Sequence, residues 1–320
     1  MKRFYLMTKK IILDCDPGHD DAVAIMLATS SSDIDLIGIT CVAGNATLEN
    51  TKQNALKICS LIGNEKVPIY SGSNNPLKYD LVTAAHVHGK SGLDTDGNPT
   101  NIKDGYSVQD MDAVDFIITT CHEQPEEIYL CPVGPLTNIA KAIIKDPSII
   151  NKIKEIVFMG GAAMCLGNIT PAAEFNIYVD PHPANIVLNS GAKITMFGLD
   201  VTHKVMINDR IINDIASNNN KTSLFFADLM NYYSKTHRKV FDINESPLHD
   251  PCVIAYLIDE NIFNGKFVNV QVEEDSKLTR GKTVTDWVNV TDRKPNCHVM
   301  IEANSEKFFS MLKKELQKLN

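Results

Sequence analysis

The sequence contains no long apolar run, no cluster of basic residues and no closely spaced pair of cysteines. A transmembrane helix needs about 20 consecutive apolar residues, so we expect no membrane-spanning segment, and the polar start, Met1 to Lys10, leads us to expect no secretory signal. The 39 acidic residues outnumber the 31 basic ones and give a net charge of −8. This charge argues against nucleic-acid polymers and membranes as partners, while a small neutral ligand remains compatible with it.

The eight cysteines are scattered, and most lie in apolar stretches. This pattern is typical of buried small hydrophobic residues rather than of disulfides or zinc ligands. We therefore expect a cytoplasmic protein with reduced thiols. Internal repeats, linkers and low-complexity tracts are also missing, so we expect a single domain over residues 1–320. Residues 1–8 are expected to be a flexible N-terminus, with Met7 as an alternative start.

The stretch from residue 11 to residue 28 holds the densest group of acidic side chains. The apolar run Ile11–Leu13 predicts a buried strand, and Ala22–Ala28 predicts a buried helix. Pro17 and Gly18 turn the chain between them. Four carboxylates crowd around this turn: Asp14, Asp16, Asp20 and Asp21. Because like charges this close repel, a hard cation with oxygen ligands is expected among them.

Three simpler explanations of this acidic turn can be tested on the sequence. Helix capping needs one or two aspartates rather than four. An EF-hand loop beginning at Asp14 would need Gly and Glu at the positions that hold His19 and Ile25. A phosphate-binding loop would need further glycines and a Gly-Lys-Ser/Thr sequence, and Gly18 stands alone.

Strand and helix patterns alternate along most of the chain and predict an α/β fold. Such an order favours a mostly parallel, Rossmann-like central sheet flanked by helices. Residues 71–110 look like a loop, and the C-terminal part, from residue 267, carries strands and a polar helix. Strands are predicted at 34–42, 67–70, 127–133, 155–159 and 193–197, and helices at 47–62, 180–191 and 222–239. Ligands bind such sheets at the carboxyl ends of strands, where Asp14, Asp16 and Asn45 fall.

The run D-C-D-P-G-H-D-D-A, residues 14–22, resembles the N-terminal signature of the inosine-uridine-preferring nucleoside hydrolases. Later segments, among them Glu174–Asn176 and His249-Asp250-Pro251, match the family in order, so the resemblance covers nearly the whole chain. It implies the nucleoside hydrolase fold, Ca²⁺ as cofactor and a homodimer or homotetramer. The implied reaction is hydrolysis of the N-glycosidic bond of ribonucleosides in nucleoside salvage. Uridine and inosine are the expected substrates, with cytidine as a further candidate.

The resemblance also implies a role for individual residues. Asp16, Asp21, Asp250 and the carbonyl group of Val133 would hold Ca²⁺. Asp16 would also be the general base, and His249 would protonate the leaving base. The positions expected to contact the substrate are Asp20, Asn45, His88, Asn168, Glu174, Phe175, Asn176, Tyr233 and His237.

The residue types agree with these roles. Calcium prefers the oxygen ligands that cluster here, whereas zinc would favour Cys and His. Glu174 and Asn176 are two residues apart and would face one way if extended, which suits the binding of sugar hydroxyls. Tyr233 and His237 are four residues apart and would share one face of a helix. Asp14 would support the site without touching the metal.

The chain departs from the family pattern at three positions. Val133 stands where the family usually has Thr, but a backbone carbonyl ligand makes no demand on the side chain. Asp94 follows Gly92-Leu93 where a glycine is usual, and His237 stands where relatives often have Tyr. The single tryptophan, Trp287, lies outside every motif, so a purine-only specificity is not expected.

Two other classes of function remain open at this stage. A phosphotransferase of the Asp-x-Asp type would use Asp14 or Asp16 as nucleophile, but it would need a lysine and a second acidic pair that no motif supplies. A non-catalytic protein that binds nucleosides or ribose could retain the same pocket. The presence of both Asp16 and His249 argues against that alternative.

Overall fold

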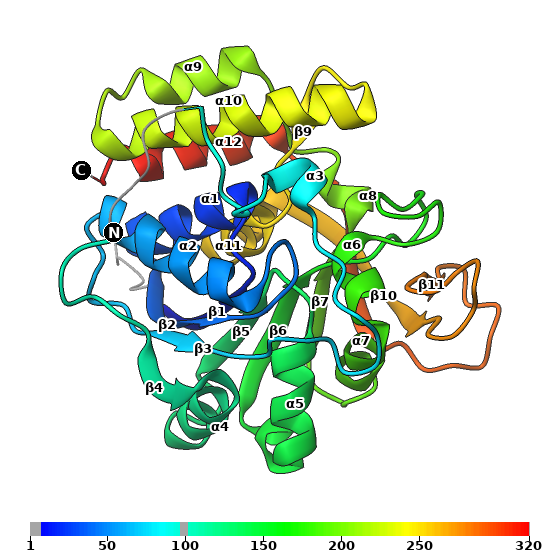
Figure 1. The fold of residues 1–320 in the computed structure, drawn as a ribbon. Coiled ribbons are helices and arrows are strands. Elements are labelled where there is room, and N and C mark those ends of the chain that lie inside the picture. Colours follow the sequence, from blue (N-terminus) through cyan, green and yellow to red (C-terminus); the bar gives the residue numbers. More distant parts are fainter. Residues whose placement is uncertain (1–7, 97–101, 320) are drawn as a thin grey trace, which may run out of the picture.

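The computed structural model of the chain describes residues 8–96 and 102–319 (Figure 1). The expectation of a flexible N-terminus over residues 1–8 falls outside these ranges except at Thr8, and the alternative start at Met7 also falls outside them. The strands of the main sheet are β1 (Lys9–Cys15), β2 (Ile34–Cys41), β3 (Ile69–Ser71), β4 (Gln109–Asp112), β5 (Ile128–Pro132), β6 (Ile153–Met159), β7 (Ile194–Phe197), β10 (Phe263–Val272), β11 (Thr283–Asp286) and β12 (Cys297–Ala303). A separate pair consists of β8 (Met206–Ile207) and β9 (Ser246–Pro247).

The ten strands form one sheet in the order β11-β10-β12-β7-β6-β5-β1-β2-β3-β4. All neighbouring pairs from β12 to β4 are parallel, and β10 runs antiparallel to both of its neighbours. The predicted fold, a mostly parallel sheet flanked by helices, is therefore confirmed.

Helices cover both faces of this sheet (Figure 1). The α-helices are α1 (His19–Ser30), α2 (Leu48–Leu61), α3 (Ala85–His88), α4 (Ala113–Glu123), α5 (Thr137–Lys145), α6 (Phe175–Val179), α7 (Pro181–Leu188), α8 (Leu199–Thr202), α9 (Asp209–Ala216), α10 (Lys221–Phe241), α11 (Pro251–Ile258) and α12 (Ser305–Leu316). Two 3-10 helices are η1 (Pro147–Asn151) and η2 (Glu260–Ile262).

Strand β1 shows how the sequence builds the two cores. Its side chains alternate, so Ile11 and Leu13 pack with α1, α11 and α12, while Ile12 packs with α4, α5 and α7 on the other face. Helix α1 is buried on every side except at Thr29, which explains its continuous apolar run. The acidic turn between β1 and α1 is therefore held by two of the most deeply buried elements.

The interval 71–110 differs from the prediction of a loop. It contains α3 and the first two residues of β4, and each of these elements is only four residues long. Elements this short show too little of a helical or strand period to be recognised from sequence.

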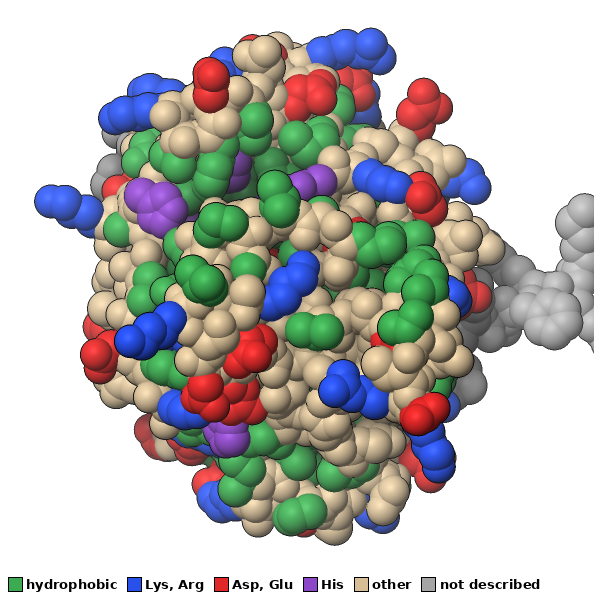
Figure 2. All heavy atoms as spheres, turned by 90° about the vertical axis from the view of Figure 1, so that its right-hand side faces the viewer, with side chains coloured by type: hydrophobic (Ala, Val, Ile, Leu, Met, Phe, Trp, Pro, Cys, Tyr) green, Lys and Arg blue, Asp and Glu red, His purple; other side chains and the backbone are tan. Residues whose placement is uncertain are grey.

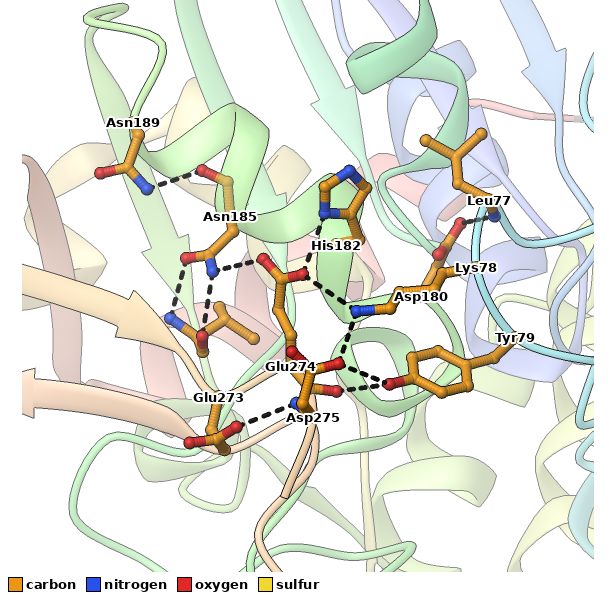
Figure 3. A network of polar contacts seen from close by, with 11 residues as sticks. Leu77, Lys78, Tyr79, Asp180, His182, Asn185, Asn189, Glu273, Glu274 and Asp275 are labelled. Atoms are coloured by element: carbon orange, nitrogen blue, oxygen red, sulfur yellow. Dashed lines mark hydrogen bonds and ion pairs between the residues drawn. The ribbon is translucent and has the colours of Figure 1, made fainter. Parts of the chain in front are cut away.

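The segment between β10 and β11 is tied to distant parts of the chain by a polar network (Figure 3). Glu274 accepts a hydrogen bond from His182 of α7, at 2.9 Å, and its carbonyl oxygen accepts one from Tyr79, at 2.7 Å. The guanidinium carbon of Arg280 lies 4.1 Å and 4.2 Å from the ring centroids of Tyr178 and Tyr79. These contacts fix the loop before α3 against the antiparallel edge of the sheet.

Within residues 8–96 and 102–319, no helix combines the length and the apolar character needed to cross a membrane. On the face shown in Figure 2, acidic and basic side chains are interspersed, and no broad area of one sign is visible.

Candidate active site

A pocket opens at the carboxyl edge of the sheet, where β1, β2, β5 and β6 end and α1 begins. This is the edge at which parallel sheets bind ligands. Histidine side chains gather in the upper part of the face in Figure 2, where the surface is hollowed. The residues that line the pocket are Asp20, Asn45, Ala84, His86, Val87, His88, Val133, Met159, Asn168, Ile169, Glu174, Phe175, Asn176, Tyr233, His237, Phe241, His249 and Asp250.

Carboxylates crowd the floor of this pocket. Oxygen atoms of Asp20, Asp21 and Asp250 lie within 4.8 Å of one another, and all three residues are buried. Burial, followed by the charge of Asp21, raises the pKa of Asp20 to about 8. Burial and the neighbouring carboxylates raise the pKa of Asp250 well above its ordinary value. These acids can remain ionised together only beside a positive charge.

Asp16 lies in a tight cradle beside this group. Its Oδ2 accepts a hydrogen bond of 2.6 Å from the backbone N–H of Asn45, and its enclosed Oδ1 has no partner among residues 8–96 and 102–319. A Cβ atom at Gly44 or at Gly134 would clash with the carboxylate. Burial, followed by the charges of Asp21 and Asp20, raises its pKa well above the ordinary value. An enclosed oxygen without a partner, in an all-oxygen set of buried ligands, fits a hard divalent cation.

Asp21 closes the turn from the helix side. Its Oδ2 accepts hydrogen bonds from the backbone N–H of Gly18, at 2.9 Å, and from the side-chain amide of Asn45, at 3.1 Å. Its Oδ1 accepts one from the backbone N–H of Asp16, at 3.2 Å. Asp20 and Asp21 both lie in the first turn of α1, so the helix begins three residues before the predicted Ala22.

Asp14 contacts the site only from behind. Its Oδ2 accepts hydrogen bonds from Thr40, at 2.6 Å, and from the side-chain amide of Asn138, at 2.7 Å. Burial raises its pKa to about 7, against the effect of these two donors. Asp14 does not line the pocket. This position is compatible with the predicted role, in which Asp14 supports the site without touching the metal.

Glu174 and Asn176, which are predicted to bind the sugar, do not lie on an extended segment, in contrast to the geometry considered from the sequence. Glu174 is the N-cap of α6 and accepts hydrogen bonds from the backbone N–H groups of Asn176 and Ile177. The two-residue spacing is therefore a helix cap rather than one face of a strand. The Asn168 side chain accepts a hydrogen bond of 2.9 Å from the backbone N–H of Phe175, and burial raises the pKa of Glu174 to about 7.

The carbonyl oxygen of Val133 points to the same region. It accepts a hydrogen bond of 2.8 Å from the side-chain amide of Asn176. A carbonyl oxygen has two lone pairs, so this bond leaves one available to a second partner.

Rings form the opposite wall. Tyr233 and His237 share one face of α10, as predicted, with ring centroids 4.1 Å apart. Nδ1 of His249 lies 2.8 Å from the hydroxyl group of Thr202. Burial lowers the pKa of His237 to about 4 and that of His249 well below its ordinary value. Trp287 does not line the pocket.

Several residues near the site had no predicted role. Thr202 contacts His249 although 47 positions separate the two residues in the sequence. His19 lies inside the N-terminal signature and stacks on His88 and Tyr233. Asp200 accepts hydrogen bonds from the backbone N–H groups of Ala163, Met164 and Cys165. These hydrogen bonds hold the loop that follows β6, so the role of Asp200 is structural.

Clustered carboxylates, amides and imidazoles at the carboxyl edge of a parallel sheet define a metal-dependent hydrolase of small polar molecules. The chain belongs to the inosine-uridine preferring nucleoside hydrolase family, whose model matches residues 11–310. It is therefore an N-glycosyl hydrolase that acts on nucleosides.

Curated relatives support this membership. The pyrimidine-specific ribonucleoside hydrolase RihA of Citrobacter koseri is 40% identical over 311 residues, which cover 97% of this chain and 98% of that protein. RihA of Escherichia coli is 41% identical over 312 residues, covering 97% and 99%.

Solved structures agree over nearly the whole chain. A plant nucleoside hydrolase superposes with a TM-score of 0.90 at 33% identity, covering 97% of this chain and 99% of the other. A purine-preferring ribonucleoside hydrolase from Gardnerella vaginalis gives a TM-score of 0.89 at 33% identity, covering 97% and 98%.

Proposed function

We propose that the enzyme hydrolyses uridine, inosine and cytidine to ribose and free base with the help of Ca²⁺. The observation that carries this proposal is the group of four buried carboxylates: Asp16, Asp20, Asp21 and Asp250. Asp16, Asp21, Asp250 and the carbonyl group of Val133 would hold the ion. When bound, Ca²⁺ supplies a positive charge that lowers the pKa of a neighbouring water molecule.

Asp16 acts as the general base in this proposal. Asn45 occupies its Oδ2 through a backbone N–H group, so Oδ1 is the oxygen left for further contacts. Once Ca²⁺ keeps this carboxylate ionised, it can accept the proton of a neighbouring water molecule. Asp20 belongs to the same carboxylate group and also lines the pocket, and in this proposal it accepts a hydrogen bond from a ribose hydroxyl.

The sugar is held by polar side chains on one side of the pocket. Asp20, Asn45, Asn168, Glu174 and Asn176 all line it, with Phe175 beside them. Carboxylates and amides arranged in this way orient the ribose hydroxyls by several hydrogen bonds.

The base is placed against the rings of His88, Tyr233 and His237, and His249 donates the proton to it. Nδ1 of His249 faces Thr202, so Nε2 is the nitrogen available to the pocket. Protonation matters because the base leaves with developing negative charge.

Uridine is proposed as a good substrate, with inosine cleaved at a comparable or lower rate. The relatives that are 40% and 41% identical are pyrimidine-specific, whereas the purine-preferring structure is 33% identical. Ribose release measured across uridine, cytidine, inosine and adenosine tests this proposal. An enzyme that cleaves inosine but leaves uridine intact would contradict it.

A phosphotransferase is disfavoured by the charge of the pocket. None of the described residues that line it is a lysine or an arginine. A phosphate group would therefore meet carboxylates without a cationic side chain to neutralise it.

We also propose a cytoplasmic homodimer or homotetramer that meets neither membranes nor nucleic-acid polymers. All eight cysteines are free, and all but Cys165 are buried, as suits a reducing compartment. Light scattering in solution distinguishes the two assemblies.

The purified enzyme is expected to carry about one Ca²⁺ per chain, because the buried carboxylates are otherwise uncompensated. Elemental analysis measures this stoichiometry. Removal of the ion with EGTA is expected to lower the melting temperature, since a ligand at 100 times its Kd stabilises a fold by about 2.7 kcal/mol. Zinc at stoichiometric level in place of calcium would contradict the assignment of the ion.

A further inference from the structure

Asn138 is a fully buried residue to which the proposed reaction gives no role. It is the second residue of α5, and it does not line the pocket. Its side-chain amide nevertheless makes three hydrogen bonds, each to a different segment at the carboxyl edge of the sheet. These segments lie around Asp16, so a single side chain connects the parts of the chain that enclose the proposed base.

The donor end of the Asn138 amide joins the ends of β1 and β2. Its Nδ2 donates to Oδ2 of Asp14, at 2.7 Å, and to the carbonyl oxygen of Cys41, at 3.1 Å. The acceptor end holds the segment that follows β3, because Oδ1 accepts a hydrogen bond of 2.8 Å from the backbone N–H of Ser73. A side-chain amide has two N–H donors and two acceptor lone pairs, so this one uses three of its four sites.

The neighbours of Asn138 allow only one orientation of its amide. The carbonyl oxygen of Cys41 can only accept a hydrogen bond and the N–H of Ser73 can only donate one, so a reversed amide would leave both without a partner. A carboxylate at this position would also place an oxygen against Cys41, and a hydrocarbon side chain would leave the same buried groups unpaired. A Cβ atom at Gly72 would overlap with both ends of the amide, so this glycine leaves the space that the side chain occupies. The position therefore requires an asparagine.

The loop after β2, residues 42–45, carries the contact that holds the carboxylate of Asp16. Its last residue, Asn45, donates its backbone N–H to Oδ2 of Asp16, at 2.6 Å, and its side-chain amide to Oδ2 of Asp21, at 3.1 Å. A Cβ atom at Gly44 would clash with the carboxylate of Asp16, so the backbone of this loop lies directly against it. A shift of the loop would therefore displace the carboxylate and, with it, the unpaired Oδ1.

Asn138 holds this loop at two places. The first is its start, because Cys41, whose carbonyl oxygen accepts from Asn138, directly precedes the loop. The second is its middle, where the backbone N–H of Ala43 donates to the carbonyl oxygen of Ser73, at 2.9 Å, while Asn138 holds Ser73 by its N–H. Both attachments depend on one side chain, so its replacement would loosen the loop without removing any atom that lines the pocket.

We propose that Asn138 is a positioning residue that sets the direction of the Asp16 carboxylate by holding the loop of residues 42–45. The proposal deepens the proposed function and rests on it for the identity of the base and of the metal ion. The hydrogen bonds of Asn138 depend on neither, so its effect on the loop can be measured in enzyme that carries no metal ion and no substrate.

Asn138→Leu removes all three hydrogen bonds with little change in the size of the side chain. Asn296→Leu is the matched control, because the Asn296 side chain also makes three hydrogen bonds, to backbone groups of Leu188 and Val270, and does not line the pocket. Hydrogen–deuterium exchange of the metal-free enzyme, followed by mass spectrometry, reports the amide protons of residues 42–45. We expect exchange to be roughly 10-fold faster or more in Asn138→Leu, because buried groups are left unpaired, and unchanged in Asn296→Leu. Wild-type exchange in Asn138→Leu, or the same acceleration in both variants, would overturn the proposal.

Asn138→Asp is a second variant that changes less of the side chain. It keeps the shape and the acceptor for Ser73, but it replaces the donor with an oxygen that faces the carbonyl group of Cys41. The loop of residues 42–45 should again exchange faster than in the wild type, because two acceptors then face each other. Exchange at the wild-type rate in this variant would also overturn the proposal.

Calcium affinity and kinetics supply the second readout. Calorimetric titration of the metal-free enzyme with Ca²⁺ should give a Kd roughly 10- to 100-fold higher in Asn138→Leu, as is typical of groups that orient metal ligands, and an unchanged Kd in Asn296→Leu. At saturating Ca²⁺, kcat should fall by one factor for both uridine and p-nitrophenyl riboside, since the base serves both, and KM should change less than kcat because the pocket lining is intact.

The outcomes separate this proposal from the proposed function. Unchanged Kd and kcat in an Asn138→Leu variant whose loop exchanges faster would overturn the proposed link between Asn138 and Asp16. A wild type that binds no Ca²⁺ or releases no ribose, but whose loop depends on Asn138 in the exchange experiment, would overturn the proposed function while supporting the positioning role.

Discussion

Asp16→Asn is expected to lower kcat for uridine by at least about 10⁴-fold, because it removes a proposed metal ligand and the proposed base together. The substitution keeps the volume of the side chain, and its amide oxygen can still accept the 2.6 Å hydrogen bond from Asn45. The fold should therefore persist, which circular dichroism and thermal unfolding can verify. Ribose release under saturating uridine measures kcat.

Asp14→Asn is the matched control for this substitution. Both aspartates are fully buried at the end of β1, but Asp14 contacts Thr40 and Asn138 rather than the pocket. The control should retain bound Ca²⁺ and stay within about 10-fold of wild-type activity, as expected for a residue behind the ligands. Near wild-type kcat in Asp16→Asn would show that another group is the base.

The second large effect is expected from His249→Ala. Loss of a general acid costs about 10²- to 10⁴-fold when the leaving group needs a proton. Inosine cleavage should fall by this amount, because the departing purine is stabilised by protonation. The p-nitrophenolate of p-nitrophenyl riboside leaves without a proton, so its release should change by less than about 10-fold.

His203→Ala provides the comparison. Its ring lies 5.7 Å from that of His249, but it does not line the pocket. This variant should cleave inosine and p-nitrophenyl riboside at the wild-type rates. Equal losses on inosine and on p-nitrophenyl riboside in His249→Ala would remove His249 from the role of acid.

The sequence predicts the local elements around the site well, because their causes are local. The apolar runs beside the acidic turn are β1 and α1, and Tyr233 and His237 lie on one helical face. Helical and strand periods are visible over such lengths. The pocket also collects every predicted substrate-contacting residue.

Contacts between segments that are distant in the sequence could not be predicted from such local patterns. His19 and Asp94 meet across 75 positions, and Thr202 and His249 across 47. The role of Glu174 as a helix cap was missed because α6 has only five residues and shows no clear period. Short elements and loop-to-loop contacts are set by the packing of the whole chain, so a pattern within a single segment does not reveal them.

Calcium-supported hydrolysis of ribonucleosides is tested most directly by removing and restoring the metal ion. Enzyme stripped with EGTA, and shown by elemental analysis to be free of metal, should release no ribose from uridine. Addition of about one Ca²⁺ per chain should restore the original rate, whereas Zn²⁺ should not, since the site offers oxygen ligands. Full activity of the metal-free enzyme, or recovery with Zn²⁺ alone, would contradict the role proposed for the carboxylates of the acidic turn.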